Sequence, residues 1–191
     1  APAQAAGLWC PPPRRIAVFR ALQLGDMLCS VPALRALRQA APQAHITLIG
    51  LPNAAGFVRR FAHYIDELMP FPGLPGMPEQ AADGAALPPF YEQARARRFD
   101  LAIQLHGSGT LTNPVLEQLG AARTAGFVPP DAMPPSPLFI RWPDHLPEIL
   151  RYTALMQHLG APAADARLEF PLGDADRAEC AALLAATGLA P

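Results

Sequence analysis

The chain has no lysine, few charged residues and no long apolar segment. All 15 of its Lys-or-Arg positions are arginine, and the formal net charge of the 191 residues is −1. Proteins that bind nucleic acid through its phosphates carry a broad cationic field, so this balance argues against a nucleic-acid partner. Arginine also suits phosphate and carboxylate contacts, but an alanine-rich, GC-rich coding bias explains the absence of lysine more simply. No apolar run reaches the roughly 18 residues of a membrane-spanning helix.

Cysteine is scarce and widely spaced. Cys10, Cys29 and Cys180 form no C-x-x-C pair and no cluster with histidine, which excludes a disulfide framework and a zinc site. Reduced thiols are typical of a cytoplasmic protein. The opening residues lack the basic and apolar regions of a signal peptide, and we expect residues 1–13 to form a flexible, proline-stiffened leader.

Short apolar strands alternate with amphipathic helices along the rest of the chain. This alternation is typical of a mainly parallel sheet covered on both faces. Without an internal repeat or a sharp boundary, residues 14–191 are predicted to form one Rossmann-like, doubly wound α/β domain. Strands are expected at about 16–20, 45–50, 66–70, 99–105 and 123–128, helices at about 28–39, 53–64, 87–98, 113–119, 146–159 and 176–187, and proline-rich loops at 71–89 and 129–143.

Asp26 follows the first strand closely, in the segment ALQLGDML. Open α/β sheets bind ligands beyond the carboxyl ends of their strands, where the strand order reverses. There, a carboxylate can act as a general base that takes the proton of an acceptor hydroxyl. Spacing alone favours a different role for Asp26, as the N-cap of the following helix, which would then kink at Pro32. Alternatively, Ser30 caps that helix and Pro32 lies in its first turn.

Two groups of polar residues are expected to meet at the sheet edge. With the strand order 3-2-1-4-5, the ends of the first and fourth strands are neighbours at the reversal. His106 could hold a sugar or a phosphate, although a hydrogen bond to a nearby loop explains it better. The glycine-flanked Ser108 fits an anion-binding turn or an ordinary turn, but not a nucleophile elbow. The converging residues are Arg20, Gln23, Gly25 and Asp26 on one side and His106, Gly107, Ser108 and Gly109 on the other.

Common cofactor motifs are absent from the chain. Neither G-x-G-x-x-G nor the P-loop pattern occurs, which argues against a nicotinamide-dependent oxidoreductase. The D-x-D pair Asp174 and Asp176 directly precedes a helix, and capping together with the helix dipole accounts for both acids. We therefore expect no metal and no cofactor.

The ordered succession of segments resembles glycosyltransferase family 9, the ADP-heptose:lipopolysaccharide heptosyltransferases of Gram-negative bacteria. The resemblance implies a GT-B architecture, in which two Rossmann-like domains face each other across a cleft. The amino-terminal domain would receive the lipid-linked acceptor, the lipid A–Kdo core, and the carboxyl-terminal domain would hold the donor ADP-heptose. The similar segments are R-x-L-x-L-G-D-M-L, SVPALRALR, APQAHITLI, YIDELMPFP, RRFDLAIQLHGSG, LEQLGAARTAGF and HLPEILRYTALMQHLGAP, spanning residues 15–191.

The resemblance also implies roles for individual residues. Asp26 would be the catalytic base of an inverting transfer that needs no metal, which reverses the preference for a cap. The residues expected to bind the acceptor are Arg20, Gln23, Gly25, Arg59, Arg60, His106, Gly107 and Ser108.

The resemblance covers only the acceptor half of such an enzyme. The chain is then either a fragment or a natural single-domain relative. In both cases it is expected to be inactive alone. It would work in the cytoplasm, with peripheral contact at the inner leaflet of the inner membrane as a further expectation. The alternative is a stand-alone module that binds a glycan or an anion without catalysis; the missing donor half favours it, and the Gly-Asp pair speaks against it.

Overall fold

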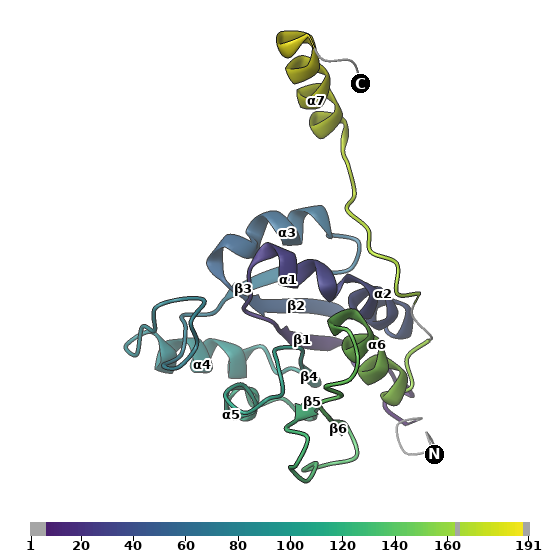
Figure 1. Cartoon of the computed structure of the whole chain (residues 1–191). Helices are drawn as coiled ribbons and strands as arrows, with labels where there is room; N and C mark the ends of the chain where they lie inside the picture. The colour runs from purple at the N-terminus through teal and green to yellow at the C-terminus, as the bar shows by residue number, and fades with distance from the viewer. Residues whose placement is uncertain (1–6, 163–164, 189–191) are drawn as a thin grey trace.

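A six-stranded sheet forms the centre of the computed structural model, which describes residues 7–162 and 165–188. All strand pairs are parallel, in the order β3-β2-β1-β4-β5-β6 (Figure 1). The predicted fold class is therefore confirmed, and the observed order contains the order 3-2-1-4-5 that was assumed in placing the strand ends side by side. The strands are β1 (Arg15–Phe19), β2 (His45–Gly50), β3 (Glu67–Pro70), β4 (Leu101–Gln104), β5 (Thr124–Val128) and β6 (Phe139–Arg141).

Helices cover both faces of this sheet because side chains along each buried strand alternate between two cores. In β1, Ile16 and Val18 join the core under α2, α3 and α6, whereas Ala17 and Phe19 join the core under α4 and α5. A strand covered on both faces is apolar throughout, which the sequence of β1 shows. The helices are α1 (Leu24–Cys29), α2 (Val31–Ala40), the 3-10 turn η2 (Pro52–Ala54), α3 (Ala55–Arg60), α4 (Leu87–Ala96), α5 (Asn113–Gln118), α6 (Glu148–His158) and α7 (Asp174–Thr187).

The helical structure is interrupted at Ser30, which separates α1 from α2. The alternative with Pro32 in the first turn of α2 is confirmed, although the Ser30 hydroxyl donates to the carbonyl of Met27 at 2.7 Å and makes no capping bond. Asp26 is the third residue of α1, and the N-cap position belongs to Gln23. The interpretation of Asp26 as a helix cap is therefore wrong.

Three local expectations differ from the structure. The predicted loop 129–143 contains β6, a strand of only three residues that pairs with β5. Asn113 followed by Pro114 predicts a cap and a first helical position, but Thr112 takes the N-cap position of α5 and the Asn113 side chain donates to the carbonyl of Phe127 at 2.8 Å. The leader expected to be flexible is packed at Leu8, which is buried, and at Trp9, whose indole donates to the carbonyl of Leu159 at 2.7 Å. Residues 1–6 lie outside the described residues.

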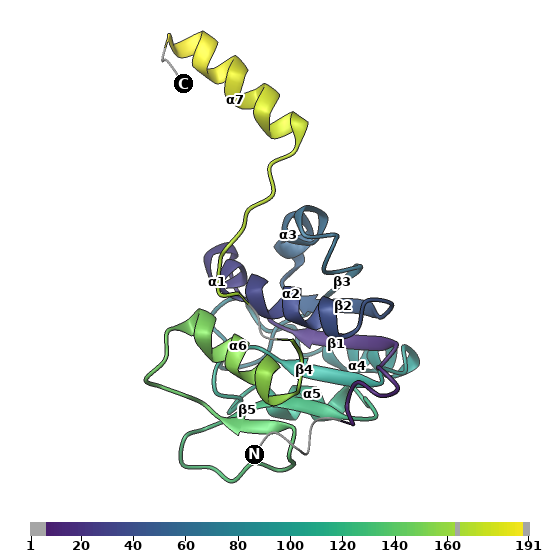
Figure 2. The same cartoon turned by 90° about the vertical axis from the view of Figure 1, so that its right-hand side faces the viewer.

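Helix α7 stands apart from the sheet at the end of an extended segment (Figures 1 and 2). It begins two residues earlier than predicted and ends, as predicted, before Gly188, which has a left-handed φ of 66°. None of its residues is buried. Arg35 of α2 holds the extended segment through the carbonyls of Asp165 and Arg167 at 3.1 and 2.9 Å. Across the residues that the structure describes, no helix is both long and apolar enough to cross a membrane.

Candidate functional site

The carboxyl ends of β1 and β4 lie side by side at the reversal of strand order, as the sequence predicts. The backbone N–H of Ala21 donates to His106 Nδ1 at 3.3 Å. The Arg20 guanidinium donates to the carbonyl of Leu105, immediately beyond β4. The loops after the two strands therefore meet, and we call this place, together with the hollow beside it that His106, Gly107 and Ser108 line, the strand-end crevice.

Arg20 is fully buried at the base of this crevice. Its Nε donates to the carbonyl of Asp26 at 3.1 Å, and its Nη2 forms an ion pair with Glu148 Oε1 at 3.0 Å. Its guanidinium carbon lies 4.5 Å from the centre of the Tyr152 ring. Its donors face protein atoms and none of its surface is exposed in this structure, and its role toward an acceptor stays a prediction.

Glu148 and Tyr152 are site residues that the sequence analysis missed. The Tyr152 hydroxyl donates to Glu148, which also accepts from Arg20. Burial alone would raise the pKa of Glu148, but the hydrogen bonds from Tyr152 and Arg20 lower that pKa below its usual value. Burial raises the pKa of Tyr152, which keeps the hydroxyl protonated. Their four-residue spacing, which places two side chains on one helix face, was the available sequence signal.

Asp26 lies in the first turn of α1 and is exposed. In the described part of the chain its carboxylate accepts no hydrogen bond, whereas its backbone carbonyl is held by Arg20. A Cβ added to Gly25 would meet nothing within 4 Å, so the space in front of this turn is open. The site thus combines a fixed backbone with a carboxylate that has no hydrogen-bond partner among the described residues, which leaves its oxygens available to accept a proton.

The His106 ring connects the ends of β1 and β4 through its hydrogen bond with Ala21. Burial lowers its pKa from 6.5 to about 4, and the nearby Glu79 carboxylate opposes this only in part. Because Nδ1 accepts the N–H of Ala21, the proton of the neutral ring lies on Nε2, 3.9 Å from Glu79 Oε1. His106, Gly107 and Ser108 also line a hollow of about 200 Å³. The structural explanation weighed for His106 accounts for its ring, and its role toward an acceptor stays a prediction.

We expect the low pKa of His106 to make stability depend on pH. Its folded-state pKa of about 4 lies below the ordinary 6.5, so the unfolded chain takes up the proton first. Stability present above pH ~6.5 should be lost as the pH falls toward about 4, by on the order of 3 kcal/mol. Urea unfolding at pH ~7.5 and ~4.5 measures this loss, which should be smaller in His106→Gln. The exposed His145→Gln is the control, and equal losses in all three proteins would contradict the assignment.

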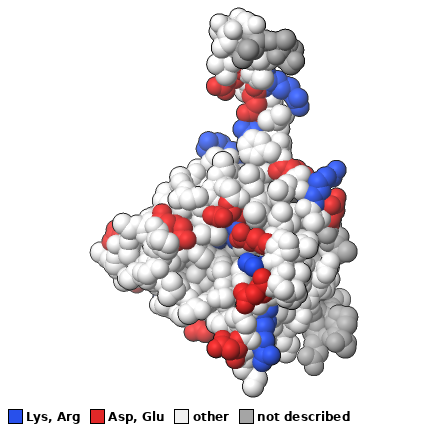
Figure 3. Space-filling view, viewed as in Figure 1, with Lys and Arg blue, Asp and Glu red and all other residues white. Residues whose placement is uncertain are grey.

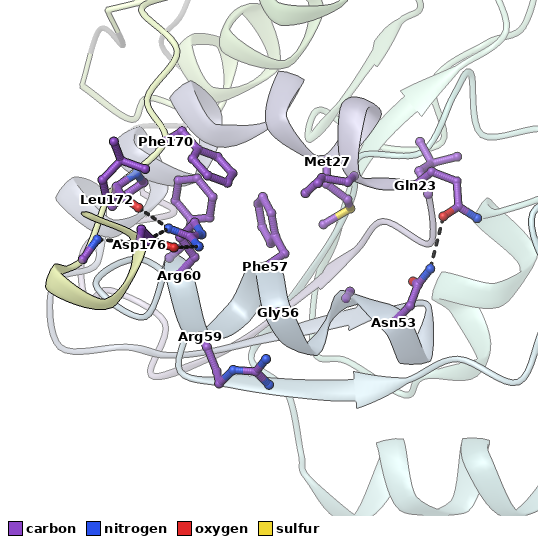
Figure 4. A pocket seen from close by; sticks show the side chains of 16 residues that line it. Gln23, Met27, Asn53, Gly56, Phe57, Arg59, Arg60, Phe170, Leu172 and Asp176 are labelled. Carbon is purple, nitrogen blue, oxygen red and sulfur yellow. Dashed lines mark hydrogen bonds and ion pairs between the residues drawn. The ribbon is translucent and has the colours of Figure 1, made fainter. Parts of the chain in front are cut away.

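A larger hollow lies on the other side of α1 (Figure 4). It has a volume of about 680 Å³, and α1, η2, α3 and residues 170–176 line it; we call it the α1–α3 hollow. Gln23, expected to bind the acceptor, lies here and accepts from Asn53 Nδ2 at 3.2 Å. Arg59 is exposed and makes no hydrogen bond or ion pair within the described residues. It is therefore available to an anion.

Arg60 is already paired. Its two Nη atoms donate to the two carboxylate oxygens of Asp176, both at 2.8 Å, and its guanidinium lies 4.4 Å from the centre of the Phe170 ring. The hydrogen bonds from Arg60 and from the N–H of Gly173 hold the pKa of Asp176 well below its usual value. Asp176 therefore neutralises Arg60 in this structure, and the expected role of Arg60 in acceptor binding stays a prediction.

The described residues form no cluster of metal ligands, and the face of the molecule seen in one view carries no broad basic patch. Over residues 7–162 and 165–188, no three His, Cys, Asp or Glu side chains gather to hold a metal ion. On the face shown in Figure 3, basic and acidic groups are interspersed and form no broad basic patch. Asp176 of the D-x-D pair is occupied by Arg60 and by the start of α7.

Comparison with known proteins finds similarity in structure only. Family models and curated proteins give no match by sequence. A glycosyl transferase family 9 structure from Veillonella parvula matches with a TM-score of 0.71 at 22% identity, covering 93% of this chain and 51% of that one. The E. coli heptosyltransferase WaaC with ADP-2-deoxy-2-fluoro heptose matches with a TM-score of 0.59 at 18% identity, covering 81% and 51%. E. coli ADP-heptose lps heptosyltransferase II gives 0.57 at 17%, covering 93% and 51%.

These matches show the fold that the sequence resemblance implies. The chain spans about half the length of each of these three structures. It therefore has the fold that a family 9 glycosyltransferase and two heptosyltransferases adopt over about half of their length.

Proposed function

We propose that this chain is the acceptor-binding half of an inverting GT-B glycosyltransferase, which transfers heptose from ADP-heptose to the lipopolysaccharide inner core. The observation that carries this proposal is the free Asp26 carboxylate at the reversal of strand order, on a backbone fixed by Arg20. The fold shared with two heptosyltransferases supports the choice of reaction. The lipid A–Kdo core would be the acceptor, met at the cytoplasmic leaflet of the inner membrane.

In this mechanism Asp26 is the general base. As the acceptor hydroxyl oxygen forms its bond to the anomeric carbon, Asp26 takes the hydroxyl proton and ADP leaves with the bonding electron pair. Attack from the side opposite ADP inverts the anomeric centre. The donor would be bound mainly by a second domain, so this chain contributes the base and the acceptor surface and needs no cofactor of its own.

Acceptor binding at the crevice would depend more on hydrogen bonds than on cations. Arg20 is buried and Arg60 is paired with Asp176, which leaves Arg59 exposed. Neutral polar groups come from half-buried Ser108 in the loop after β4 and from exposed Gln23 before α1, whose amide lines the α1–α3 hollow. Hydroxyl-rich glycans are recognised by such neutral groups, and their orientation places the reacting oxygen.

Calorimetric titration tests this proposal. The chain is titrated with de-acylated, Kdo-containing core and, separately, with ADP-heptose. We expect the core to bind, with affinity reduced by Ser108→Ala and by Gln23→Ala, and ADP-heptose to bind weakly or not at all. Tight binding of ADP-heptose without the core would contradict the acceptor assignment. If neither ligand binds, another glycan or a site completed by a second domain becomes the better hypothesis.

A further inference from the structure

The small hollow of the strand-end crevice is built from two separate segments of the chain. The turn after β4 forms one part of its lining, and residues 77–79 of the proline-rich loop form the other. Its volume of about 200 Å³ lies below the roughly 300–1,000 Å³ of sites for drug-sized molecules. The hollow therefore has room for about one small ring.

Buried Gln104 sets the orientation of the turn. Its Nε2 donates to the carbonyls of His106 and Gly107, the latter at 3.1 Å, and its Oε1 accepts the N–H of Phe127 at 3.2 Å. The N–H and C=O of a trans peptide point in opposite directions. The N–H groups of Gly107 and Ser108 therefore point away from Gln104, toward the exposed side of the turn. Neither N–H donates a hydrogen bond to another of the described residues.

Two glycines keep this turn in a conformation that other residues would strain. Gly107 and Gly109 have left-handed φ angles of 61° and 91°, and a Cβ on Gly109 would clash with the carbonyl oxygen of Phe127. Glycine adopts such angles without steric cost. The two unpaired N–H groups are thus held in place before a ligand arrives, which lowers the ordering cost of binding.

Glu79 also lines the hollow, and its carboxylate has no hydrogen-bond donor among the described residues. Its Oε2 is buried without a partner, and its Oε1 lies 3.9 Å from His106 Nε2, beyond hydrogen-bond distance. A buried carboxylate oxygen without a donor costs free energy, which a donor from a ligand would return. Because the terminal torsion of glutamate is broad and roughly two-fold, either oxygen can turn to the hollow.

This combination of groups fits hydroxyls better than a charged ligand. An anion would accept from the two N–H groups but would be repelled by the Glu79 carboxylate. An ammonium group would pair with Glu79 but would leave the N–H groups without an acceptor. A hydroxyl both donates and accepts, so neighbouring hydroxyls on one ring can satisfy both. Met77 and Leu111 line the same hollow and offer apolar surface to the C–H groups of such a ring.

We infer that this hollow binds one neutral, hydroxyl-bearing sugar ring, whose hydroxyls donate to Glu79 and accept from the N–H groups of Gly107 and Ser108. Glu79 is then a specificity-determining residue, because its charge disfavours an anionic ring at the same place. The inference rests on the proposed function in that the ring is taken to be part of the acceptor glycan. It adds Glu79, which the sequence analysis did not single out.

Glu79→Gln removes the charge with little change of shape. It should weaken binding of a neutral ring about tenfold, because a hydrogen bond to a charged acceptor is lost. It should strengthen binding of an anionic ring, because the repulsion disappears. A merely structural role of Glu79 would not produce these opposite effects. Glu117→Gln is the matched control, since Glu117 is exposed on α5 and lines neither hollow, and it should change neither affinity.

The experiment is a ligand titration of the chain and its two variants, followed by NMR through the backbone amide signals. Methyl α-D-glucoside and methyl α-D-mannoside are the neutral rings, methyl α-D-glucuronide is the anionic ring, and ethylammonium is the cation. We expect at least one neutral ring to shift the Gly107 and Ser108 amide signals in a saturable way. The glucuronide and ethylammonium should bind the unchanged chain more weakly than that ring.

Three results would overturn the inference: no saturable shift of these amides with either neutral ring, tighter binding of the glucuronide or ethylammonium than of both neutral rings, or equal affinity for a neutral ring in Glu79→Gln and Glu117→Gln. If Glu79→Gln fails to fold, the order of the ligands on the unchanged chain decides.

Failure of this sugar site and failure of the proposed function give different results. If de-acylated core binds and Glu79→Gln does not weaken it, the sugar site is rejected and the acceptor role stands. If a neutral ring binds in a manner that depends on Glu79 while the core does not bind, the sugar site stands and the proposed acceptor is rejected.

Discussion

Replacing Asp26 with asparagine is expected to lower turnover by about 10²–10⁴-fold in a glycosyltransferase that carries this domain, since asparagine cannot take the acceptor proton. Folding should be unaffected, because the carboxylate is exposed and the hydrogen bond from Arg20 goes to the backbone carbonyl. Turnover with saturating donor and acceptor, together with urea unfolding of the same protein, measures both parts of this expectation.

Asp144→Asn is the matched control for Asp26→Asn. Asp144 is also exposed, and it lies before α6 outside the two hollows. Its replacement should change neither turnover nor stability. Near-normal turnover of Asp26→Asn would reject Asp26 as the base. A loss of about 1 kcal/mol in Asp26→Ala with an unchanged rate would instead indicate a contribution to the helix end.

Replacing Arg20 with methionine should destabilise the domain by about 3–5 kcal/mol. Methionine fills part of the volume but donates no hydrogen bond. Three acceptors would then lose their hydrogen-bond donor: the carbonyls of Asp26 and Leu105 and the carboxylate of Glu148. Arg20→Lys should recover only part of the loss, because one ammonium cannot reproduce the planar set of donors. Urea unfolding near neutral pH measures these differences.

Two comparisons separate the buried network from a general effect of losing an arginine. Arg59→Met, at an exposed position, should change the free energy of unfolding by less than about 0.5 kcal/mol. In the double variant Arg20→Met/Glu148→Leu, the Glu148 carboxylate that Arg20→Met leaves without its ion-pair partner is removed as well. Part of the stability lost in Arg20→Met should therefore return. A loss of less than about 1 kcal/mol in Arg20→Met would show that the network contributes little.

The sheet was predictable because buried parallel strands read as continuous apolar runs between turn residues. The strand FDLAIQL is of this kind, and the structure contains β4 there; the segment DELMP, which begins with two acids, forms the partly buried edge strand β3. The strand β6 was not predictable, because three residues between proline-rich segments carry no period and gain their order only by pairing with β5. The N-cap of α1 was misplaced because Asp is a preferred cap residue, yet Gln23 occupies that position.

The meeting of the two strand ends was predictable, but the partners of the residues there were not. The sequence indicated which loops meet, because parallel strands end at one edge of the sheet. Whether an arginine at that edge is free depends on residues far along the chain. Glu148 lies 128 residues from Arg20, and Asp176 lies 116 residues from Arg60. No local pattern reports such a pair, so Arg20 and Arg60 were both expected to be available to a ligand.

The way in which α1 is held has a consequence for motion. This helix has only six residues, too few to keep its shape in water by its own hydrogen bonds. Arg20 connects its backbone at Asp26 to the end of β4 and to α6. The Asp26 backbone therefore moves with the sheet rather than with the surface loops around it. In the proposed mechanism, the base would keep its place while the surrounding loops move to admit and release an acceptor.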